Sequence, residues 1–108
     1  MPNEYMYGWE KLYNAVNSLA LGTVSLQERL ANAMLHSLEL IRDQHMPSEL
    51  YVRLETVRER FRQVHIAPAD MGTISASASR INDDDAYEIA KEIVSLFNGQ
   101  CEAYYKNT

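Results

Sequence analysis

Three histidines and one cysteine are the side chains best suited to metal binding or nucleophilic chemistry: His36, His45, His65 and Cys101. No two histidines stand four residues apart, and none belongs to a His-Glu-x-x-His motif, so the spacing of a helical metal site is missing. A single cysteine excludes an intrachain disulfide and a zinc site built from cysteines. We therefore expect no metal and no cofactor. We interpret Cys101 as an inert core residue on the apolar face of a helix.

The acidic run Asp83–Asp85 is a second candidate for binding a cation. An EF-hand loop would also need acidic or amide groups at alternate positions, a central glycine and a terminal glutamate, and these are missing here. Aspartates are typical of helix N-termini, where a carboxylate accepts hydrogen bonds from free N–H groups and meets the positive end of the helix dipole. We interpret the run as a helix cap, with surplus negative charge that can face a basic partner.

The common signatures of enzymes are missing from the sequence. Its serines do not lie in a Gly-x-Ser-x-Gly motif, and its four glycines do not form a phosphate-binding loop. We therefore predict no catalytic residues and a protein that is not an enzyme.

Four arginines between residues 47 and 64 could contact nucleic acid: Arg53, Arg58, Arg60 and Arg62. Glu55 and Glu59 lie among them, and the chain carries a formal net charge of −5 with a pI near 5.1. Because DNA-binding domains normally show a basic surface, we interpret these arginines as a solvated charged face. A helix-turn-helix protein whose 47–64 helix reads DNA stays open as an alternative.

Apolar residues recur at steps of three and four in four segments, which is the spacing that places them on one side of an α-helix. The predicted helices cover residues 7–21, 26–43, 47–64 and 83–105. Ser25 and Glu28 have the spacing of a capping box at the start of the second helix, and Pro47 suits the first turn of the third. Gly22 is expected to end the first helix with a positive φ.

The predicted helices differ in how much apolar surface they show. The apolar side of segment 26–43 is broad, because Leu35 and Leu40 widen it, so we expect this helix to be the most central. Segment 47–64 instead has a narrow apolar seam at alternating steps of four and three. The seam consists of Leu50, Leu54, Val57, Phe61 and Val64.

The 108 residues have the length of one domain, and two of the three connections between the predicted helices are short. We predict that residues 1–108 form a single all-α domain, a compact four-helix bundle with alternating helix directions. Residues 65–82 are predicted to form a long loop. Asn98-Gly99 is expected to kink or end the last helix.

Alternating helix directions would bring the start of the first helix beside the end of the last. Five tyrosines and the single tryptophan would then share one end of the bundle. They are Tyr5, Tyr7, Trp9, Tyr13, Tyr104 and Tyr105. Because Tyr and Trp are enriched where proteins meet, we take these six as candidate partner-binding residues.

The location of the protein is predicted from what the sequence lacks. Its apolar runs are far shorter than the roughly 20 residues that a membrane-spanning helix needs. The first residues also lack the basic and apolar stretches of a secretion signal. We therefore expect no membrane partner and a cytoplasmic location, which the unpaired cysteine also favours.

These patterns predict a non-enzymatic protein that acts through protein–protein contacts. The broad side of segment 26–43, the seam of segment 47–64 and the aromatic cluster offer more apolar surface than one bundle would bury, so we expect a homo-oligomer. A first alternative is an acidic inhibitor or regulator that occupies a basic site on a partner protein, given the net charge and Asp83–Asp85. The helix-turn-helix protein is the second alternative.

Overall fold

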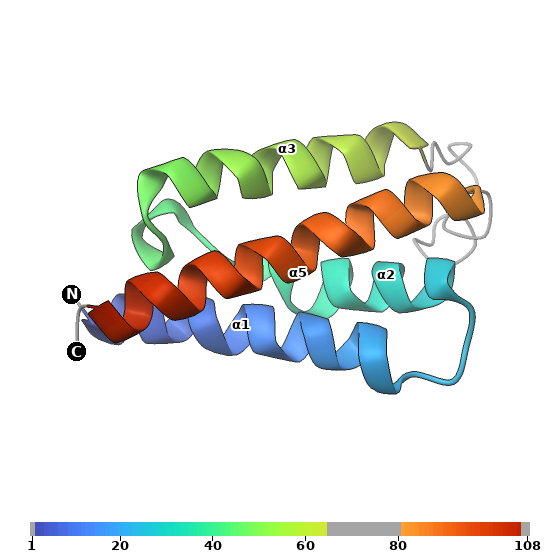
Figure 1. Ribbon diagram of the computed structural model, residues 1–108. Helices are drawn as coiled ribbons and strands as arrows, with labels where there is room; N and C mark the ends of the chain where they lie inside the picture. The colour runs from blue at the N-terminus through green and yellow to red at the C-terminus, as the bar shows by residue number, and fades with distance from the viewer. Residues whose placement is uncertain (1, 65–80, 107–108) are drawn as a thin grey trace.

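The computed structural model describes residues 2–64 and 81–106, so nearly all of the predicted loop at 65–82 lies outside the described residues. Within these residues, four α-helices run in alternating directions and pack as a bundle (Figure 1). They are α1 (Pro2–Leu21), α2 (Leu26–His36), α3 (Ser48–Val64) and α5 (Asp83–Lys106). No strand occurs among the described residues, and the predicted all-α four-helix bundle is confirmed.

The second helix is shorter than predicted, because α2 ends at His36 and not near residue 43. At Ser37 the backbone leaves helical geometry, with φ −133° and ψ −61°, although its N–H still donates to the carbonyl oxygen of Ala33. Two 3₁₀ turns then lead to α3, η1 (Leu38–Leu40) and η2 (Asp43–His45). Leu38 and Ile41 are fully buried although they follow the end of the α-helix. The apolar spacing that predicted a helix to residue 43 therefore continues beyond the helix itself.

The central helix is α5, which packs against α1, α2 and α3, so the expectation that segment 26–43 lies most centrally was wrong. Leu35 and Leu40, which made that segment look broad, are 48% and 42% exposed. In contrast, α5 buries a stripe along most of its length, and its members are Ala86, Ile89, Ile93, Leu96 and Gln100.

The last helix continues through Asn98-Gly99 without a break, so the helix does not end there as one form of the prediction had it. An added Cβ at Gly99 would lie 3.0 Å from Cδ2 of Leu50, and the glycine therefore lets α3 approach α5 closely. Gly22 also differs from the prediction, because its φ lies outside the left-handed region. The Arg29 side chain packs over Gly22, so that an added Cβ would lie 2.7 Å from Cδ of Arg29.

The first helix starts at Pro2, five residues before the predicted start at residue 7. Gly8 lets this extension pass close to η2, because a methyl group there would collide with the carbonyl oxygen of His45. At the other end of α1, the Arg29 guanidinium donates to the carbonyl oxygen of Leu19 in the last turn of the helix, which the helix end leaves free, and to that of Val24 in the connection to α2.

Two predicted helix starts are confirmed, that of α2 at Leu26 and that of α5 at Asp83. The Ser25 hydroxyl accepts a 3.2 Å hydrogen bond from the N–H of Glu28 and donates to the Glu28 carboxylate. At the start of α5 the Asn82 side chain accepts a 2.8 Å hydrogen bond from the N–H of Asp85. The side chain that caps α5 is therefore Asn82, and the aspartates that were predicted to cap the helix lie in its first turn, where the positive end of the helix dipole favours them.

The third helix carries the predicted seam, in which Leu50, Leu54, Val57 and Phe61 are buried. The Val64 side chain lies outside the described residues. One arginine does not lie on the predicted charged face, because Arg58 is only 5% exposed.

Candidate protein interaction surface

The aromatic side chains predicted to cluster divide into two groups. Trp9 is at the centre of the larger group, where its ring stacks on Tyr13 with 5.1 Å between centroids and an interplanar angle of 9°. The Trp9 ring also lies 6.2 Å from the Tyr104 ring, which in turn lies 5.2 Å from Tyr105. Four of the six predicted residues therefore meet where α1 begins and α5 ends.

Tyr5 and Tyr7 make their contacts elsewhere. The Tyr7 ring packs on His45 with 4.2 Å between centroids, and the Lys11 ammonium lies 5.1 Å from the centre of the same ring. Tyr5 lines a shallow groove beside Leu50 of α3. These two tyrosines thus connect α1 to η2 and to the start of α3.

Phe97 and Cys101 belong to the larger aromatic group, although neither was among the six candidates. Phe97 lies 6.1 Å from Trp9 and 6.2 Å from Tyr13 between ring centroids. The Trp9 indole N–H donates to Sγ of Cys101 over 3.3 Å, and the thiol is half-buried and not in the core. Their spacing could have revealed them, because residues 87, 90, 94, 97, 101 and 104 form a second stripe beside the buried one.

The aromatic group continues into an apolar hollow of about 410 Å³ between α1, α2 and α5. Residues that line the hollow are Val16, Leu19, Ala20, Leu26, Tyr87, Ala90, Lys91 and Val94. Tyr87 and Val94 are 59% and 41% exposed, and Tyr13 on the aromatic side is 44% exposed. Together the two regions form one surface, which we name the α1–α5 apolar face. It consists of Trp9, Tyr13, Val16 and Ala20 of α1 and of Tyr87, Ala90, Val94, Phe97, Cys101, Tyr104 and Tyr105 of α5.

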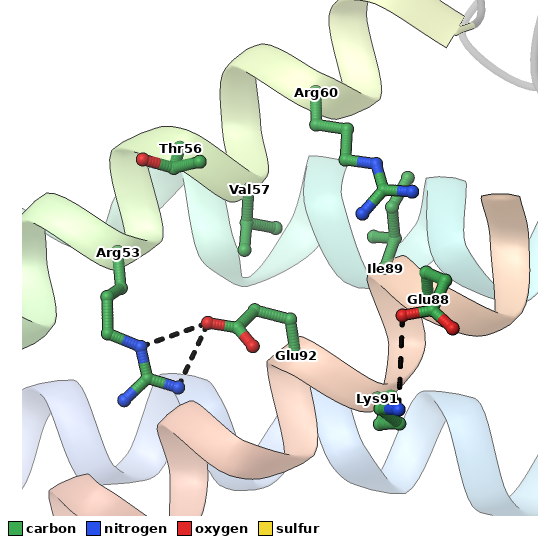
Figure 2. A pocket seen from close by; sticks show the side chains of 8 residues that line it. All are labelled: Arg53, Thr56, Val57, Arg60, Glu88, Ile89, Lys91 and Glu92. Atoms are coloured by element: carbon green, nitrogen blue, oxygen red, sulfur yellow. Dashed lines mark hydrogen bonds and ion pairs between the residues drawn. The ribbon is translucent and has the colours of Figure 1, made fainter.

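A second concave site lies between α3 and α5 and encloses about 220 Å³ (Figure 2). The Arg53 guanidinium donates to Glu92 over 2.9 Å and to the hydroxyl of Ser95 over 2.8 Å. Lys91 lies 3.9 Å from Glu88 in the same groove. Because cations and carboxylates pair within this groove, it offers a charged ligand little unbalanced charge.

The other arginines of α3 also make contacts within the protein. Arg60 lies 3.5 Å from Asp85, and Arg62 lies 2.8 Å from Glu59. The Arg58 guanidinium donates inwards to the carbonyl oxygens of Leu38 and Ile41. These pairings leave α3 without the row of free cations that contacts to a phosphate backbone require.

The histidines do not converge in the structure. His36 is exposed at the end of α2, His45 packs on Tyr7, and His65 lies outside the described residues. Burial lowers the pKa of His45 below 6.5; Arg42 contributes to the decrease, and Glu4 and Asp43 oppose it. Nδ1 of His45 accepts a 2.8 Å hydrogen bond from the N–H of Arg42, which suits the neutral imidazole. Across residues 2–64 and 81–106, no three His, Cys, Asp or Glu side chains are placed to share a metal ion.

Comparisons of the chain with protein-family models, curated proteins and solved structures gave no match. Within the part of the chain that the structure describes, no helix has the length and apolar character needed to cross a membrane.

Proposed function

We propose that the protein is a non-enzymatic helical module that acts through protein–protein contacts and associates with itself through the α1–α5 apolar face. The observation that carries the proposal is the continuity of this face, in which apolar side chains follow one another from Tyr105 to Tyr87 along α5 and from Trp9 to Ala20 along α1. Exposed apolar surface of this extent is typical of sites where proteins meet.

The size of the face supports a weak but specific association. From Tyr87 to Tyr105 the α5 helix extends about 27 Å at its usual rise per residue. Two neighbouring helices about 10 Å apart present a strip about 20 Å wide, so each copy would bury about 500 Å². A pair would bury about 1,000 Å² in total, the lower limit for specific interfaces, and we expect association at micromolar concentrations.

The side chains of the face also suit a partner. Trp9, Tyr13 and Tyr104 combine large apolar area with polar tips, and such residues dominate the binding energy of many interfaces. The charged groups that line the face are few, with Lys91 at its border. A cytoplasmic location is part of the same proposal, because the half-buried thiol of Cys101 would stay reduced there.

Sedimentation velocity over a micromolar concentration series tests the proposal with a matched pair of variants. Val94 and Val52 are both exposed valines within helices, but Val94 lies on the α1–α5 apolar face and Val52 on α3. We expect the wild type and Val52→Arg to dimerise and Val94→Arg to stay a monomer of 12.4 kDa. Trp9→Ala and Tyr105→Ala should also weaken association while helical circular dichroism persists.

Two results would contradict the proposal. A wild type that remains monomeric at every concentration removes self-association. If Val94→Arg and Val52→Arg weaken the dimer equally, the contact between the copies lies outside this face. Binding to a basic protein that disappears as salt rises would instead favour the acidic inhibitor. That alternative has less support, because Asp83 and Asp85 already contact Gln27 and Arg60.

A further inference from the structure

The α1–α5 apolar face has two unlike ends. At one end the aromatic rings of Trp9, Tyr13 and Tyr104 gather over Cys101, and Tyr13 is 44% exposed. At the other end the surface is hollowed, because Ala20 and Ala90 are small, and the space amounts to about 410 Å³. Bulky side chains thus occupy one end of the face, and space for bulky side chains lies at the other.

We propose that two copies pair in an antiparallel manner, so that the aromatic end of each copy covers the hollow of the other. This inference rests on the proposed self-association and adds the orientation of the partner. Two identical faces pack about a two-fold axis that lies in the plane between them. An axis along the helices would stack like ends on each other, whereas an axis across the helices stacks unlike ends.

The level of each residue along the face follows from the ring contacts. Trp9 contacts Cys101, and Tyr13 contacts Phe97. In both pairs the two residue numbers add up to 110, because α1 and α5 run in opposite directions. Other residues of α1 and α5 that lie side by side should follow the same relation. Val16 with Val94 and Ala20 with Ala90 continue this relation in the hollow. The middle of the face therefore lies between residues 14 and 15 of α1 and near residues 95 and 96 of α5.

Charged residues at the borders of the face distinguish the two orientations. Lys91 and Glu102 are exposed and lie eleven residues apart, about three helical turns, so both project from the same side of α5. Their midpoint falls within about one residue of the middle of the face, as two-fold symmetry across the helices requires. In the antiparallel pair, Lys91 of each copy faces the partner's Glu102.

The parallel orientation would instead bring like charges together. An axis along the helices places α1 of one copy opposite α5 of the other at the same level. Glu10, exposed on the border of α1, then lies opposite the partner's Glu102. Because border charges select orientation more than they add affinity, we expect them to exclude the parallel pair.

Charge reversal at Glu102 and Lys91 tests the orientation by sedimentation equilibrium at low salt. In the antiparallel pair, Glu102→Lys and Lys91→Glu should each raise the dissociation constant about 3- to 30-fold. The effect is this large because the symmetric dimer contains two contacts between Lys91 and Glu102, and each substitution removes both. The double variant restores the ion pairs with reversed signs and should return close to the wild-type value. High salt should reduce all of these differences.

The outcomes separate this inference from the proposed function. If Glu102→Lys tightens the dimer by removing repulsion from Glu10, the pair is parallel and only the orientation fails. Independent effects of the two reversals, with no restoration in the double variant, also overturn the antiparallel pair. A wild type that never dimerises removes both proposals, and the concentration series detects that before any variant is made.

Discussion

The Arg58 guanidinium donates a 2.7 Å hydrogen bond to the main-chain oxygen of Ile41. The same nitrogen also donates to the carbonyl oxygen of Leu38, and the second terminal nitrogen contacts Glu55 at 3.1 Å. These carbonyls belong to the segment where α2 has ended and 3₁₀ turns replace it. A buried arginine on α3 thereby satisfies backbone groups that no α-helix satisfies.

Replacing Arg58 with leucine should therefore destabilise the fold strongly. The Ile41 carbonyl would lose its buried donor, and the Leu38 carbonyl would keep only the N–H of Ile41 at 3.3 Å, which costs about 2–4 kcal/mol in the free energy of unfolding. Arg62→Leu is the matched control, because Arg62 lies one turn further along α3 in an exposed pair with Glu59 and should change stability by less than about 1 kcal/mol. Urea unfolding measures both. Equal losses in the two variants would show that the buried contacts of Arg58 contribute nothing special.

Gln100 connects three elements through one side chain. Its fully buried amide donates to the carbonyl oxygen of Tyr5 over 2.9 Å and to that of His45 over 2.8 Å. The amide oxygen of Gln100 is buried without a hydrogen-bond partner. The contact thus depends entirely on the two donors of the NH₂ group.

Gln100→Glu replaces those donors with a carboxylate that would face two carbonyl oxygens. We expect a loss of about 2–4 kcal/mol at neutral pH, because the buried charge has no donor. The carboxyl pKa should rise in the folded state, so the loss should shrink as the pH falls towards 4 and the protonated acid can donate. Unfolding at several pH values measures this, with exposed Gln44→Glu as the control. A loss that does not depend on pH would contradict the assigned hydrogen bonds.

The sequence predicted most of the helix pattern because helical spacing records which side is buried. The seam Leu50–Phe61 and the cap at Ser25 are local features, and the structure confirmed them. The cap of α5 comes from Asn82 and not from the predicted aspartates. The end of α2 was missed because the buried residues Leu38 and Ile41 keep a helical spacing of three although the α-helix has ended before them. The carbonyls after the helix end accept hydrogen bonds from Arg58, twenty residues away from Leu38, and no local pattern reveals that contact.

The candidate surface was predicted only in part for a similar reason. Alternating helix directions correctly brought Trp9 and Tyr104 together, since that follows from topology alone. Tyr7 turned away to His45 because helix rotation, which side-chain packing decides, sets where each tyrosine points. The hollow between α1 and α5 arises where two small residues, Ala20 and Ala90, lie close together. They are far apart in the sequence, so the sequence alone does not indicate that they are neighbours.

The pH dependence of stability should contain a contribution from His45. Burial lowers the pKa of this imidazole in the fold, whereas the unfolded chain has a value near 6.5. Between these two values the unfolded state binds more protons, so stability should fall as the pH drops from 7 through 6.5 and below. His45→Gln should remove this part of the decrease, and His36→Gln, at an exposed site, should keep it. Thermal unfolding between pH 7 and 5 measures the difference. Identical pH profiles for both variants would contradict the burial effect.

Of the three glycines that the structure describes, Gly8 should be the least tolerant of substitution. In Gly8→Ala the new methyl group would meet the backbone oxygen of His45, which cannot move without shifting η2, and Nε2 of Gln100 at 2.9 Å. We expect a loss above about 2 kcal/mol despite the better helix propensity of alanine. Gly99→Ala is the matched comparison, because its methyl group would meet only the flexible end of Leu50 at 3.0 Å. The propensity gain of about 1 kcal/mol should there offset most of the crowding. Equal unfolding free energies for the two variants would show that α1 and η2 are less closely packed than their contacts indicate.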